Sequence, residues 1–119
     1  MIRPLPEVRA FLYNQPVDMR KSINGLAAIV DSELELNLLD KVIFVFMNRQ
    51  RDKIKLLYWE NNGFVLWYKR LEKHRFSQLP PAADPDTITM TGEGLNQLLD
   101  GFDIFNYRPH ASLNYTDFS

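Results

Sequence analysis

Two runs of residues decide the fold, Lys53-Ile54-Lys55-Leu56-Leu57-Tyr58-Trp59-Glu60 and Phe64-Val65-Leu66-Trp67-Tyr68-Lys69-Arg70, separated by Asn61-Asn62-Gly63. Asn and Gly tolerate positive φ angles, so this turn between β-forming residues predicts a tight β-hairpin. We expect its strands at about residues 52–60 and 64–71. The order of these elements indicates an antiparallel meander.

The short loop determines which side chains share a face of the hairpin. Successive side chains alternate across a strand, so odd residues of the first strand lie beside even residues of the second. One face is mostly apolar and carries Ile54, Leu56, Tyr58, Val65, Trp67 and Leu71, with Lys69 as its only cation. The other face mixes cations with rings and carries Lys53, Lys55, Leu57, Trp59, Phe64, Leu66, Tyr68 and Arg70. We expect the first face to be core and the second to be an exposed binding platform.

The segment before the hairpin supplies a strand, a helix and a central strand. Arg9 to Tyr13 is a short strand, and Asp18 is a candidate N-cap for a helix whose apolar stripe runs to about residue 34. Val42 to Met47 is a continuous apolar run, as expected of a strand in the middle of a sheet.

After a Pro-rich connector the sequence predicts two smaller elements. Thr87 to Met90 is a candidate edge strand, and Thr91 is a candidate cap for a short helix that Gly101 ends. We therefore predict an α+β domain, with an antiparallel sheet of about four or five strands, one main helix packed on a face and a short C-terminal helix. A single domain spans 1–119, in which 1–80 form the core and 81–119 hold the connector, the short helix and an acidic, aromatic tail.

Composition limits the possible classes of protein. The chain has 119 residues and no cysteine, which excludes disulfides and thiolate metal sites and is consistent with a reducing compartment. No apolar run approaches the roughly 20 residues that span a bilayer, and no signal-peptide core follows the N-terminus. We expect a cytoplasmic protein without membrane contact.

The positive charge is concentrated in one part of the chain. Residues 49–75 hold eight Lys and Arg against three Asp and Glu, whereas the whole chain has a net charge of −1. Cations interleaved with aromatic rings are typical of nucleic-acid surfaces, because phosphate neutralisation and base stacking need those residue types together. The candidate DNA-contacting residues here are Arg49, Arg51, Lys53, Lys55, Trp59, Tyr68, Lys69 and Arg70. The alternative for Arg49 and Arg51 is an ordinary solvated turn.

A second candidate lies at the start of the main helix. In Asp18-Met19-Arg20-Lys21-Ser22 two cations oppose the helix dipole unless an anion is bound. Free backbone N–H groups, Arg20, Lys21 and Ser22 form a candidate phosphate cradle. In the alternative, the two cations are solvated and pair with Asp18.

The sequence offers no catalytic constellation. His74 and His110 are isolated, and Asp52, Glu60 and Glu72 are dispersed along the hairpin. Metal-dependent nucleases and transposases need carboxylates that converge on metal ions. We therefore expect no enzyme activity, no catalytic or metal site, no cofactor and no small-molecule substrate.

The motifs also carry a family resemblance over roughly residues 9 to 80. The shared motifs are Asp18-Met19-Arg20-Lys21-Ser22-Ile23-Asn24-Gly25-Leu26, Phe44-Val45-Phe46, Asn48-Arg49, Asp52 to Trp59, Asn62-Gly63-Phe64 and Trp67 to Lys73. Together they resemble the TnpB accessory protein of insertion sequence 66 family elements. The family pattern has Thr at Val17, Arg or Cys at Met47 and Gly at His74.

The resemblance implies a bacterial mobile-element protein that is encoded beside a larger transposase, is needed for efficient transposition and has no catalytic role. From the charge pattern we expect it to assist by contacting DNA. In the competing interpretation the same surface docks the transposase or another accessory protein, because clustered Trp, Tyr and Arg are also typical of protein-binding hot spots. In a third, the cations only keep the sheet monomeric.

Overall fold

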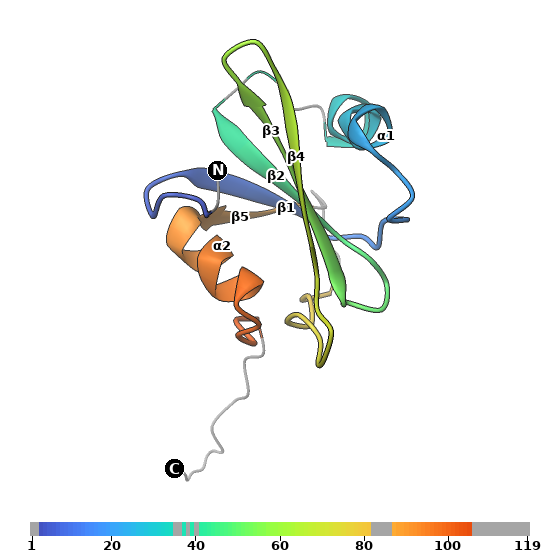
Figure 1. Cartoon of the computed structure of the whole chain (residues 1–119), viewed down its shortest axis with the longest axis vertical. Helices are drawn as coiled ribbons and strands as arrows, with labels where there is room; N and C mark the ends of the chain where they lie inside the picture. Colours follow the sequence, from blue (N-terminus) through green and yellow to red (C-terminus); the bar gives the residue numbers. More distant parts are fainter. Residues whose placement is uncertain (1–2, 35–36, 38, 40, 82–86, 106–119) are drawn as a thin grey trace, which may run out of the picture.

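A five-stranded sheet forms the centre of the protein (Figure 1). The computed structural model describes residues 3–34, 37, 39, 41–81 and 87–105. The strand order is β4-β3-β2-β1-β5. The strands are β1 (Arg9–Tyr13), β2 (Val42–Met47), β3 (Lys53–Glu60), β4 (Gly63–Arg70) and β5 (Thr87–Thr91). The α+β class and the number of strands agree with the sequence prediction.

The β3–β4 hairpin has the predicted register. Glu60 pairs with Gly63 across the two-residue loop, whose Asn61 takes a positive φ of 55°. Lys55 lies opposite Tyr68, and Leu56 lies opposite Trp67. The assignment of side chains to the two faces of the hairpin is therefore confirmed.

β2 occupies the middle of the sheet, as its apolar run predicted, and all six of its residues are buried. Its pairing with β3 is antiparallel, but its pairing with β1 is parallel. A parallel pair needs a crossover connection, which the helical segment between β1 and β2 supplies. The sheet is thus mostly antiparallel rather than a simple meander.

Helix α1 (Ile23–Ile29) begins later than expected and continues as a π-helical turn, η1 (Val30–Leu34). Its N-cap is Ser22, so the prediction that Asp18 caps this helix is wrong. Asp18 instead closes a separate turn, in which its side chain accepts the amide of Arg20 and its carbonyl accepts the amide of Lys21. Arg20 and Lys21 therefore precede the helix and do not lie in its first turn, as the prediction had placed them.

Both faces of the sheet are covered, with α1 on one face and α2 (Gly92–Leu99) on the other (Figure 1). The α2 face holds Ile54, Leu56 and Tyr58, the face predicted to be core. α1 packs on the opposite face, where Leu26 and Val30 meet Leu57 in one buried cluster. The expectation that the mixed face is an open platform is wrong over most of its length, because its apolar side chains are covered by α1.

The C-terminal elements match their sequence signals. β5 is an edge strand, and the hydroxyl of Thr91 accepts the Gly94 amide at the start of α2. Gly101 follows the helix with a φ of 90°, the left-handed geometry that favours glycine after a helix. The predicted tail beyond residue 105 and the connector at 82–86 lie outside the described residues.

Candidate nucleic-acid interface

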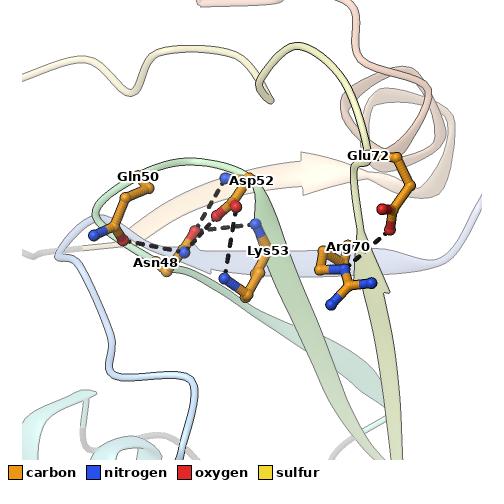
Figure 2. Close-up of polar contacts among 6 residues, drawn as sticks. All are labelled: Asn48, Gln50, Asp52, Lys53, Arg70 and Glu72. Atoms are coloured by element: carbon orange, nitrogen blue, oxygen red, sulfur yellow. Dashed lines mark hydrogen bonds and ion pairs between the residues drawn. The ribbon is translucent and has the colours of Figure 1, made fainter.

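The buried side chain of Asn48 organises the loop between β2 and β3 (Figure 2). Its Oδ1 accepts the amides of Asp52 and Lys53, and its Nδ2 donates to the carboxylate of Asp52 at 2.7 Å and to Gln50 at 3.3 Å. The donation from Asn48, aided by the nearby Lys53 charge, lowers the pKa of Asp52. This network fixes the loop that presents Arg49 to solvent.

The segment after β4 lies beside this loop. The backbone of Arg51 has a φ of 60°, its carbonyl accepts the Phe76 amide, and its guanidinium donates to the Phe76 carbonyl. The amide of Leu71 donates to the Asp52 carbonyl. These contacts bring the segment 70–75, whose cations are Arg70, Lys73 and Arg75, next to the β2–β3 loop.

The turn that carries Arg20 is closed by an exposed ion pair. The Arg20 guanidinium donates to both carboxylate oxygens of Asp18, the shortest contact being 2.6 Å. This hydrogen bonding lowers the pKa of Asp18 to about 2 and raises that of Arg20. For Arg20, the structure therefore shows the pairing with Asp18 that was the alternative to a phosphate cradle.

Lys55 is a structural partner of this turn rather than part of an exposed platform. Its side chain is buried, with only 9% of the residue exposed, and its ammonium donates to the carbonyls of Met19 and Lys21 at 2.7 and 2.8 Å. The same ammonium lies 5.4 Å from the centre of the Tyr68 ring. Lys55 thus holds the Asp18–Lys21 turn over the sheet.

A groove of about 610 Å³ separates this turn from the β2–β3 loop. Its charged lining residues are Asp18, Arg20, Arg49 and Lys53. A second groove of about 300 Å³ shares Asn48 and Arg49 with the first and extends to Arg51. Among the described residues the Arg49 side chain has no hydrogen-bonding or ionic partner, so it is the least constrained cation between the two grooves.

Most of the predicted cations therefore gather at one end of the sheet, which we call the basic end. Its cations are Arg20, Lys21, Arg49, Arg51, Lys53, Arg70, Lys73 and Arg75. Its acids are Asp18, Asp52 and Glu72. Three of the cations are paired with these acids, and Figure 2 shows two of these pairs, Lys53 with Asp52 and Arg70 with Glu72. The balance of eight cations to three acids leaves a local excess of positive charge.

Besides the buried Lys55, the predicted residues Lys69 and Trp59 do not join the basic end. Lys69 is on the α2 face, where its ammonium donates to the carbonyl of Leu99 at 2.8 Å, at the C-terminus of α2. Trp59 is six residues along β3 from Lys53, about 20 Å at the usual rise per residue, and packs edge-on against Phe64. Tyr68 is closer, in the last half of β4 opposite Lys55, and is 49% exposed.

Sequence reasoning missed the organising role of Asn48 and the contribution of Lys73 and Arg75. A polar residue directly after a buried apolar strand, with Asp four residues later, is the signal that could have identified Asn48 as the centre of the loop. The positions of Lys73 and Arg75 had no such signal, because they depend on the Arg51–Phe76 contacts.

Other kinds of site find no support in the described part of the chain. There, no group of three or more His, Cys, Asp and Glu side chains could hold a metal ion. Over the same residues, none of the helices has the length and hydropathy needed to cross a bilayer.

Comparison with known proteins identifies the family. The sequence model of the family described as IS66 Orf2 like protein matches residues 8–109. This chain belongs to that family. Its members are accessory proteins of insertion sequences, which gives the chain a role in transposition.

Two curated relatives come from Sinorhizobium fredii (strain NBRC 101917 / NGR234). The uncharacterized protein y4jC is 36% identical over 103 residues, covering 87% of this chain and 86% of the relative. The uncharacterized protein y4hO is 34% identical over 96 residues, covering 81% and 82%. No solved structure matches the chain.

The three departures from the family pattern lie at structured positions. The amide of Val17 donates to the carbonyl of Met47, and both side chains are buried. His74 takes a φ of 67°, a conformation that the family's usual glycine adopts without strain.

Proposed function

We propose that this protein assists transposition by binding DNA phosphates at its basic end, without catalysing the reaction. The observation that carries the proposal is the groove between the Asp18–Lys21 turn and the β2–β3 loop, on which Arg20, Arg49 and Lys53 converge. Cations that line one groove can contact successive phosphates of a strand, and their desolvation cost is low because they are already near solvent.

The cations contribute to this surface in different ways. Arg49 is available without breaking any contact among the described residues. The Arg20–Asp18 and Arg70–Glu72 pairs are exposed, and exposed pairs are weak, so a phosphate can compete with either carboxylate. Lys53 has only a 3.5 Å contact with Asp52.

We revise the set of residues proposed to contact DNA. We keep Arg20, Lys21, Arg49, Arg51, Lys53, Tyr68 and Arg70, and add Lys73 and Arg75. Tyr68 is the ring best placed to stack on a base or sugar, since it is exposed and shares its face with Lys53 and Arg70. We assign structural roles to Lys55 and Lys69, whose ammonium groups are bound to backbone carbonyls.

The cations of this surface favour contact with the phosphate backbone of DNA over readout of the base sequence. Guanidinium and ammonium groups in a groove neutralise phosphates regardless of sequence, whereas base readout requires side chains that reach base edges. The proposal requires no cofactor and places the protein in the cytoplasm, where it meets the DNA of the element and its transposase.

Charge-matched variants test the proposal. Arg49→Ala removes a cation from the basic end, and Arg9→Ala removes one from the start of β1, at the opposite end of the sheet. We expect Arg49→Ala to weaken binding to a short duplex roughly three- to ten-fold, and Arg9→Ala to leave it nearly unchanged. Equal losses of affinity in the two variants would show that DNA binding depends only on the net charge of the protein. That result would contradict a defined DNA-binding site at the basic end.

The other candidate function is docking of the transposase or a second accessory protein. The same variants distinguish the two functions. If the surface docks a protein, Arg49→Ala should lower the affinity for the purified partner, and the wild-type protein should not retain DNA at low salt. That combination of results would replace DNA contact with protein contact.

A further inference from the structure

β4 has the composition of an internal strand but lies at the edge of the sheet. Its run Phe64 to Tyr68 is apolar or aromatic on both faces, with Phe64 and Leu66 toward α1 and Val65 and Trp67 toward α2. Strands of this kind are typically paired on both sides. Among the described residues, β4 pairs only with β3.

This edge also lacks the usual protection against pairing. Edge strands are commonly blunted by a central charge, a proline, a bulge or a short length. β4 is eight residues long, and its cations are confined to its last two positions, Lys69 and Arg70. Residues 63–67 are half-buried and Tyr68 is exposed, so apolar surface remains open along the strand. The cations of β4 therefore leave most of this edge unprotected against pairing.

The opposite edge differs. β5 has five residues and carries threonine at alternate positions, Thr87, Thr89 and Thr91. It is shorter than β4 and more polar, which makes it a poorer template for a partner strand. The open apolar edge of this protein is therefore β4.

We propose that β4 pairs antiparallel with β4 of a second copy, forming a two-fold dimer with a continuous ten-stranded sheet. A two-fold axis perpendicular to the sheet keeps the α1 faces of both copies on the same side. Residues directly opposite each other then point to the same face, and because side chains alternate along a strand, the numbers of two paired residues are both odd or both even. The axis then passes through Leu66 or Trp67. With Leu66 on the axis, Phe64 lies opposite Tyr68 of the second copy, and Val65 lies opposite its Trp67.

The charge distribution selects this arrangement. In antiparallel pairing about Leu66, Lys69 lies opposite Gly63 of the second copy, so no cations face each other. A parallel pair in register would place Lys69 and Arg70 directly against their own copies, which is destabilising. The edge is self-complementary in one orientation only, which points to a second copy of this chain as its partner. This inference does not depend on DNA binding.

Association can be measured directly by sedimentation equilibrium without DNA. We expect a concentration-dependent dimer, because an interface one strand wide is near the lower size limit for specific association. Tyr68→Lys puts a charge at an exposed position of the edge, one or two residues from the proposed axis, and should weaken the dimer at least about ten-fold. Thr89→Lys puts the same charge on β5 and should have no effect. A monomer at about 100 μM, or a dimer weakened only by Thr89→Lys, would overturn the proposal.

Cross-linking provides a second readout that does not depend on dimer strength. The chain has no cysteine, so a single Leu66→Cys or Trp67→Cys substitution puts one thiol on or beside the proposed axis. Cross-strand Cβ atoms approach to about 4.5 Å in non-hydrogen-bonded pairs, the upper end of the range for a disulfide, so a small shift of the two strands allows the bond. We expect rapid covalent dimerisation under mild oxidation for at least one of these variants and none for Thr89→Cys. Equal yields from β4 and β5, with native circular dichroism, would contradict the β4 dimer.

Discussion

The ammonium of Lys55 donates a 2.7 Å hydrogen bond to the backbone carbonyl of Met19, thirty-six residues earlier in the chain. A second bond of 2.8 Å reaches the carbonyl of Lys21. These contacts join the first half of β3 to the turn that carries Arg20. Lys55, a cation within the basic motif, is therefore buried and positions the turn that carries Arg20.

Replacing Lys55 should destabilise the protein. Lys55→Met keeps the length of the side chain but leaves the Met19 and Lys21 carbonyls without their donor, which should lower the free energy of unfolding by about 1–3 kcal/mol. Urea unfolding followed by circular dichroism measures the change. Lys53→Met is the matched control, since the Lys53 ammonium makes only a 3.5 Å ion pair, and it should be nearly neutral. A Lys55→Met protein as stable as Lys53→Met would refute this role.

The Asp18–Arg20 pair predicts a local dependence on pH. The pKa of Asp18 falls to about 2 because the guanidinium and amide of Arg20 donate to its carboxylate. A folded-state pKa below the unfolded-state value means that this contact contributes fully above about pH 4 and is lost as the pH falls toward 2. Carbon-detected NMR should give an Asp18 midpoint near 2. In Arg20→Gln the midpoint should rise toward the ordinary range, and an ordinary midpoint in the wild type would show that the pair does not persist.

His74 offers a stabilising substitution. Its φ of 67° is strained for a residue with a side chain, and such conformations cost about 1–2 kcal/mol. His74→Gly should raise the free energy of unfolding by about 1 kcal/mol, less the entropy that glycine adds to the unfolded chain. Thermal unfolding measures this. His74→Ala is the control, because it removes the imidazole but keeps the strain, and a gain of equal size from alanine would exclude the backbone explanation.

Much of the sheet follows from local sequence patterns. The apolar run Val42 to Met47 predicted a central strand because only a strand covered on both faces can bury every side chain. The Asn61–Asn62 turn fixed the register of the hairpin through its loop length. Thr91 and Gly101 predicted the ends of α2 through capping chemistry.

The position of α1 could not be predicted from the same patterns. Leu57 and Leu66 make the mixed face of the hairpin nearly as apolar as the face with Leu56 and Val65, so either could receive a helix. The cations Lys53 and Lys55 suggested that the mixed face is exposed to solvent. Burial of Lys55 is possible because backbone carbonyls of the Asp18–Lys21 turn surround its ammonium, and this contact between distant segments leaves no local sequence signal.

The salt dependence of DNA affinity tests the central proposal most directly. Fluorescence anisotropy with a labelled duplex, repeated over a range of salt concentrations, gives the slope of log K against log salt. If the basic end neutralises roughly four to six phosphates, the slope should be about −4 to −5, and it should become shallower by about 1 in Arg49→Ala. A slope near zero, or no binding at the lowest salt concentration, would contradict DNA contact.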